Sequence, residues 1–160
     1  MNILNTVKAV IILQIDGRRI LSKYYDDKLN SKQFERRLFA KTKTPKAKDE
    51  IIVLDGLLIV HKFITDSHIY IAGGNGENPL VLESVLNCLV EVVSSLASNN
   101  MNSNTVLDNL SRVIMALDEI CDGGLILEID PNLVMQRISS TNEDSMESMA
   151  QRTARRIFGI

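Results

Sequence analysis

The first part of the chain contains two strand-like apolar runs joined by a tight-turn signal. An apolar run over residues 7–15 is interrupted only by Lys8 and Gln14. Asp16-Gly17 follows, a dipeptide that tolerates the positive φ of a hairpin turn, and a second strand-like run returns over residues 19–25. The pattern predicts that the chain opens with a β-hairpin.

A helix and a group of strands are expected next. Residues 31–43 are polar except for a short apolar stripe of Phe34, Leu38 and Phe39, which predicts an amphipathic helix. A second turn signal occurs at Asp55-Gly56. Three further strands are expected, over residues 51–54, 57–64 and 68–72.

The apolar period then changes from two to 3.6, which is typical of helices. A long helix is expected over residues 79–98, with Asn78 as its cap and Pro79 at its first position. Its polar stripe is narrow, so the helix should be largely buried against the sheet or a partner. The remaining expected elements are a helix over residues 105–121, a glycine-rich end at Asp122-Gly123-Gly124, an extended segment over 125–129 and a short helix over 130–138.

This order, β-β-α-β-β-β-α-α, predicts an α+β fold: a five-stranded antiparallel sheet flanked by helices on both faces, followed by C-terminal helices. Near-continuous apolar strands also favour a sheet that is covered on both sides. We expect one domain over residues 1–140 and a helical tail over residues 141–160, where acidic residues precede basic ones.

Composition narrows the function classes. The chain has 160 residues and a formal net charge of −2, which gives no reason to expect nucleic acid. Tryptophan is absent and aromatic residues make up 4%, so base-stacking platforms are not expected. The two cysteines, Cys88 and Cys121, lie in apolar helical patterns and suit buried free thiols in a reducing compartment. No secretory signal is evident and the apolar runs are short for a membrane span, so a cytosolic protein is expected.

The residues that could carry chemistry favour a protein that is not an enzyme and holds no cofactor or metal. Residues 73–78 form a glycine-rich strand-to-helix turn, but no Gly-Lys-Ser/Thr follows to bind phosphate and magnesium. His61 and His68 flank a turn without further ligands nearby and are expected to be sheet histidines. The carboxylates between residues 118 and 130 serve either helix ends and solvent or a basic partner surface.

Several blocks of the sequence resemble, in order, the zeta-subunit family of coatomer, the COPI vesicle coat. They cover roughly residues 6–138, and no single block would carry the resemblance alone. The blocks are TVKAVIILQIDGRRILSKYYDD over 6–27, LDGL and IVHK over 54–62, EN-L with VLNCL over 77–89, and ALDEI, DGG and ILE with Asp130-Pro131 over 116–131.

The resemblance implies a longin-type adaptor small-chain fold and a structural coat subunit without catalytic activity. It implies pairing with the coatomer gamma subunit, recruitment to Golgi membranes by an Arf-family GTPase, a cytoplasmic location on the Golgi membrane and COPI vesicles, and a role in Golgi-to-ER and intra-Golgi transport. No nucleic acid and no small-molecule substrate are expected. The candidate partner-interface residues are Tyr24, Tyr25, Leu86, Leu89, Asp122, Gly123 and Gly124.

The alternative within the same fold is a clathrin-adaptor sigma-type chain, which in some complexes helps to bind dileucine sorting signals. In that family an arginine of the returning hairpin strand receives the acidic residue of the signal. Ile20 stands at the corresponding place here, with arginines at positions 18 and 19 instead, which favours the zeta family.

The lysine-rich loop over residues 41–48 has two interpretations. It is either a solvated loop or a surface that faces anionic lipid or an acidic partner.

Overall fold

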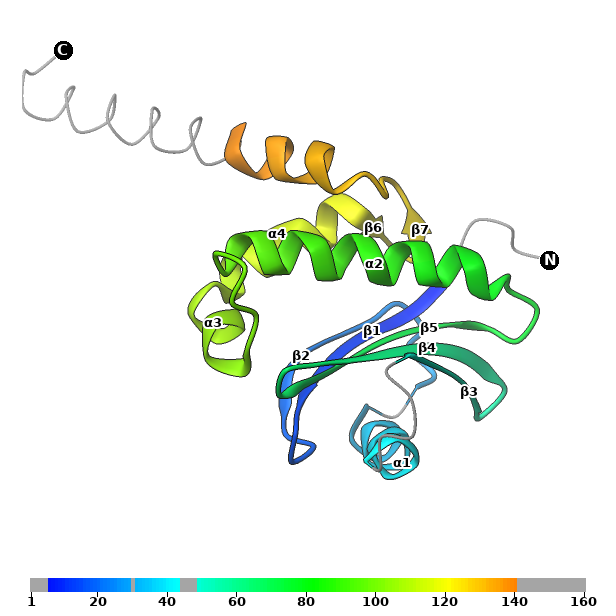
Figure 1. Ribbon diagram of the computed structural model, residues 1–160. Coiled ribbons are helices and arrows are strands. Elements are labelled where there is room, and N and C mark those ends of the chain that lie inside the picture. The colour runs from blue at the N-terminus through cyan, green and yellow to red at the C-terminus, as the bar shows by residue number, and fades with distance from the viewer. Residues whose placement is uncertain (1–5, 30, 44–48, 141–160) are drawn as a thin grey trace, which may run out of the picture.

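A five-stranded antiparallel sheet forms the centre of the molecule, with the strand order β2-β1-β5-β4-β3 (Figure 1). The structure is a computed structural model, and it describes residues 6–29, 31–43 and 49–140. The strands are β1 (Val7–Gln14), β2 (Arg19–Tyr24), β3 (Asp49–Leu54), β4 (Leu57–Ile64) and β5 (Ser67–Gly74). The fold class expected from the sequence is confirmed. The observed ends of several strands and helices differ from the predicted ones by a few residues.

The central strands β1 and β5 are buried on both faces. Side chains along β1 alternate between two separate apolar clusters. Val7, Val10 and Ile12 belong to one cluster; Ala9, Ile11 and Leu13 belong to the other. This explains why β1 is apolar without alternation in the sequence, since each side chain is covered whichever way it points.

Helices cover the two faces separately (Figure 1). Helix α1 (Ser31–Thr42) lies on one face, where it buries Phe34 and Leu38. Helix α2 (Pro79–Leu96) lies on the other face and packs with α4 (Leu110–Ile120). By length and composition α2 is apolar enough to cross a membrane, but 39% of it is buried as the core helix of this domain.

The prediction of a single helix over residues 105–121 is wrong. The structure has α3 (Ser103–Asp108) and α4 (Leu110–Ile120), which are separated at Asn109. The Asn109 side chain donates to the Thr105 carbonyl at 2.8 Å and so competes with helical backbone bonding. Helix α3 begins earlier than expected because Asn102 and Thr105 form a capping box.

A two-stranded hairpin includes the first two residues of the extended segment expected over 125–129. Strands β6 (Cys121–Asp122) and β7 (Leu125–Ile126) pair antiparallel. The Val7 N–H donates to the Gly124 carbonyl at 3.0 Å, which joins the hairpin turn to the start of β1. Residues 131–140 are helical, and the tail predicted over residues 141–160 lies outside the described residues.

The two histidines form a buried stack under α1. His61 Nε2 and His68 Nδ1 are 2.9 Å apart, and the His61 ring stacks on Tyr70 with centroids 4.7 Å apart. The Tyr70 hydroxyl hydrogen-bonds Thr42 Oγ1 at 2.6 Å, at the end of α1. Their interpretation as sheet histidines is confirmed.

Because burial disfavours an imidazolium, the pKa of His61 falls to about 4 and that of His68 is also lowered. An unfolded chain protonates histidine near a pKa of about 6.5, so it binds more protons than the folded chain below that pH. We therefore expect urea denaturation to show a loss of about 2 kcal/mol in the free energy of unfolding from pH 7 to pH 5. A His61→Phe variant should lose much less over the same range; an equal loss would contradict this account.

Gly17 fixes the distance between the first hairpin and α1. Its φ is +88°, and a Cβ placed on it would lie 2.8 Å from the Phe39 ring. A side chain at this position therefore meets both backbone strain and a steric clash.

Replacing Gly17 with alanine should lower the free energy of unfolding by about 1–3 kcal/mol, measured in urea. Gly76→Ala is the matched control, because no atom lies within 4 Å of its added Cβ and its φ is not positive. Equal stability of the two variants would show that the hairpin does not depend on this close approach.

Candidate partner-binding surface

Tyr25 and the turn at residues 122–124 lie together, although they are far apart in the sequence. The Tyr25 ring packs partly buried against the core, and its hydroxyl donates to the Cys121 carbonyl over 3.5 Å. Burial raises the pKa of this phenol, so it remains a neutral donor. Lys23 and Asp118 form an ion pair beside it. We name Tyr25 with the turn Asp122–Gly124 the Tyr25 surface.

The turn itself is open to solvent where a partner could contact it. Asp122 and Gly123 are exposed. Gly124 is buried, and its carbonyl accepts from the Val7 N–H of β1. Gly123 and Gly124 have φ values of 57° and 88°, a conformation that glycine adopts without strain. The turn therefore exposes Asp122 and Gly123 to solvent.

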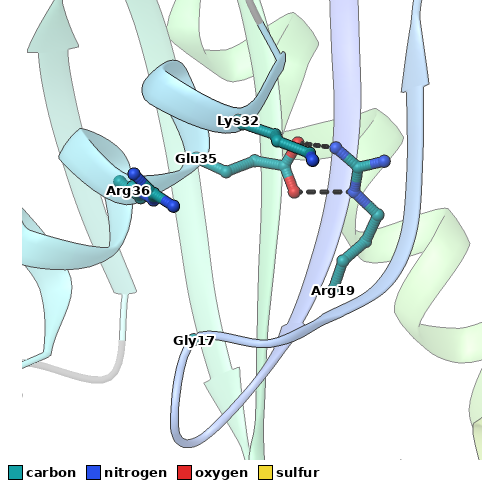
Figure 2. Close-up of a pocket in the computed structure, with 5 residues that line it drawn as sticks. All are labelled: Gly17, Arg19, Lys32, Glu35 and Arg36. Carbon is teal, nitrogen blue, oxygen red and sulfur yellow. Dashed lines mark hydrogen bonds and ion pairs between the residues drawn. The ribbon is translucent and has the colours of Figure 1, made fainter.

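Tyr24 lies on the other face of the sheet and belongs to a different set of contacts. Its hydroxyl donates to Glu35 Oε2 at 2.7 Å. Arg19 Nε donates to Glu35 Oε1 at 2.8 Å, and Arg19 Nη2 donates to Glu35 Oε2 at 2.5 Å (Figure 2). Tyr24 thus connects β2 to α1 rather than extending the Tyr25 surface.

Leu86 and Leu89 are core residues of this domain. Their side chains are 3% and 0% exposed, and both belong to the cluster between α2 and the sheet. They support the fold but lie beneath the surface, so any contribution to a partner contact is indirect.

Sequence reasoning missed an exposed apolar row next to the turn. Large apolar side chains follow the turn at alternate positions and then in the next helical segment. They are Leu125, Leu127, Ile129 and Leu133, with exposed fractions between 39% and 50%. We call them the carboxy-terminal apolar row. Alternation of apolar and acidic residues over 127–130 was the signal that could have found it.

The glycine-rich segment at residues 73–78 has a structural explanation. A Cβ on Gly73 would lie 2.9 Å from Leu82 and from the Thr6 carbonyl oxygen, so glycine is needed for close packing. Asn78 Oδ1 accepts from the Leu80 N–H at 2.9 Å and caps α2. Within residues 6–29, 31–43 and 49–140, no group of three or more His, Cys, Asp or Glu side chains could hold a metal ion.

The architecture defines a class: a small α+β domain whose antiparallel sheet carries one helix on one face and a long buried helix on the other. A chain in a homology model of the full-length AP-3 complex in a stretched open conformation has the same fold, with a TM-score of 0.64. That likeness covers 91% of this chain and 98% of the other at 15% identity.

Comparison with known proteins gives the family. The family model for the clathrin adaptor complex small chain matches residues 6–145, and the chain belongs to this family. It is 42% identical over 145 residues to coatomer subunit zeta-1 of Homo sapiens, covering 88% of this chain and 81% of that protein. Coatomer subunit zeta-1 of Oryza sativa is 37% identical over 154 residues, covering 92% of this chain and 87% of that protein. The resemblance inferred from the sequence blocks is confirmed.

Leu86→Asp should prevent stable folding, at a cost of about 4 kcal/mol or more, because it buries an unpaired carboxylate. Leu80→Asp places the same substitution on α2 at a position that is 67% exposed and should fold normally. Circular dichroism melting compares the two variants. A cooperative, near-native melt for Leu86→Asp would remove Leu86 from the core.

Proposed function

We propose that this protein is a non-catalytic structural subunit of the COPI coatomer that pairs with the coatomer gamma subunit. The observation that carries the proposal is the 42% identity to human coatomer subunit zeta-1 over 88% of the chain. In this proposal the coat is recruited from the cytosol to Golgi membranes by an Arf-family GTPase. It then acts in Golgi-to-ER and intra-Golgi transport.

The mechanism is association rather than chemistry. An obligate protein–protein interface buries more than about 2,000 Å² and is rich in apolar side chains. The carboxy-terminal apolar row and the Tyr25 surface supply exposed apolar groups and an exposed turn at adjacent positions of the chain. We assign the gamma contact to these two surfaces.

The sigma-type alternative requires an arginine at a position of the first hairpin where this chain has Ile20. The neighbouring arginines differ in their partners: Arg18 pairs with Asp16 at 2.6 Å, and Arg19 pairs with Glu35. Ile20 is 7% exposed and lies in the core cluster that packs under α2. The residue at the expected place therefore provides no cation for an acidic sorting signal.

Co-expression tests the proposal. The chain is produced with a coatomer gamma trunk and, separately, with a clathrin-adaptor large-chain trunk, followed by size-exclusion chromatography. We expect a stable one-to-one complex with the gamma trunk alone. A complex with the adaptor trunk alone would move the function to the sigma-type alternative, and a folded chain that binds neither would leave the family membership without a coat role.

Leu127→Asp in the apolar row should weaken pairing with the gamma trunk by about tenfold or more, because a carboxylate would be desolvated at the interface. Leu107→Asp, on α3, is a matched control with a similar exposed fraction, 42% against 50%. Pairing is measured by titration of purified proteins whose melting temperatures match. Equal affinities for both variants would place the gamma contact elsewhere.

A further inference from the structure

Charge is divided unevenly between the two layers that cover the sheet. Helix α1 carries four basic residues and one acidic residue, whereas α2 carries two acidic residues and no basic one. The single acid of α1, Glu35, is buried and bound to Arg19 and Tyr24. The exposed side of α1 is therefore entirely basic or uncharged, although the whole chain has a formal net charge of −2.

A hollow of about 340 Å³ lies between this helix and the first hairpin. Arg19 from β2 and Lys32 and Arg36 from α1 line it, with Glu35 at its wall and Gly17 in the hairpin turn (Figure 2). The bonds from Arg19 and Tyr24 to Glu35 join the hairpin to α1, and the absence of a side chain at Gly17 lets the turn approach Phe39. The hollow is thus bounded by two elements that are bonded to each other. We call Arg19, Lys32 and Arg36 the basic hollow.

Its cations have free hydrogen-bond donors. Among the described residues, Lys32 and Arg36 form no ion pair, and both are exposed. Arg19 uses two N–H groups on Glu35, which leaves three of the five guanidinium donors open. The other two basic residues of α1 are engaged: Arg37 pairs with Asp55, and Lys41 donates to the Val53 carbonyl.

These groups match a phosphate better than a carboxylate. Glu35 is one carboxylate against three cations, so the hollow keeps an excess of positive charge. Arginine forks and a lysine ammonium together can contact several oxygens of a single phosphate.

The surroundings favour a membrane over a protein as the source of that phosphate. Protein interfaces depend on buried aromatic or aliphatic anchors, and none of the exposed large apolar side chains in the described residues lies on α1. A charged lipid surface requires no such anchor, because each Lys or Arg near it is attracted electrostatically. Lys43, just beyond α1, is also exposed and adds to the same basic surface.

We propose that the basic hollow binds the phosphate of an anionic phospholipid headgroup, so that α1 faces the membrane. The phosphate contacts Arg19, Lys32 and Arg36 without changing the Arg19–Glu35 pair. This goes beyond the proposed pairing with gamma, which uses the Tyr25 surface and the carboxy-terminal apolar row.

Co-sedimentation of the full chain with vesicles tests the proposal. The vesicles are phosphatidylcholine alone, phosphatidylcholine with phosphatidylserine, and phosphatidylcholine with phosphatidylinositol monophosphate. We expect binding only to the two anionic preparations and its loss at high salt. Lys32→Ala/Arg36→Ala should lower the partition coefficient about 25-fold, or about 5-fold for each cation removed.

Lys62→Ala/Arg112→Ala is the matched control. It removes the same amount of charge from β4 and α4, away from the basic hollow, and neither residue forms an ion pair among the described residues. This control should bind anionic vesicles within about twofold of the original chain, since a global charge effect is screened beyond about 10 Å. Melting temperatures of both variants check that the fold is kept.

Three outcomes overturn the proposal. Equal losses in the two double variants would mean that only net charge matters. Displacement of the chain from vesicles by inorganic phosphate at an equal phosphate concentration would identify a free-phosphate site. Absence of vesicle binding, with Lys32→Ala/Arg36→Ala weakening only a protein complex, would assign the hollow to an acidic protein segment. Because vesicle binding is measured without gamma, its failure is distinct from failure of the pairing.

Discussion

The requirement to cover both faces of β1 and β5 shapes the rest of this structure. Neither strand has a face open to solvent, so the sheet is stable in water only with α1 on one side and α2 on the other. That burial uses the apolar side of α2, the most hydrophobic helix of the described chain, within the domain itself. The apolar side chains left for a partner are those exposed outside this core, such as the carboxy-terminal apolar row.

The buried carboxylate of Glu35 has a comparable influence on the α1 side. Burial of a carboxylate costs hydration energy unless the charge is paired and hydrogen-bonded. Arg19 and Tyr24, both on β2, provide these bonds to Glu35 on α1. The same pairing fixes one wall of the basic hollow and leaves its remaining cations facing solvent. One structural ion pair therefore sets both the hairpin position and the charge of this surface.

The membership of this chain in the clathrin adaptor complex small-chain family is consistent with a domain that works by presenting surfaces. The residues that the sequence offered as candidates for phosphate or metal binding have structural roles. His61 and His68 stack under α1, Gly73 permits close packing, and Asn78 caps α2. The surfaces we assign to partners and membrane are instead made of exposed apolar and basic side chains.

The sequence by itself determined the fold class, the five strands and the long helix after them, because apolar periodicity, Asp-Gly turns and the Asn78 cap are local signals. It also determined the family through blocks such as VLNCL and DGG. The division of the helix at Asn109 is also local, since the Asn109 side chain bonds to Thr105 four residues away, and Tyr24 and Tyr25 face opposite sides as neighbouring strand residues do. Only the tertiary structure placed Leu86 and Leu89 in the core. It alone joined Arg19 to Glu35 and Tyr25 to the turn after Cys121. These features depend on contacts between segments distant in sequence, for which a local pattern carries no information.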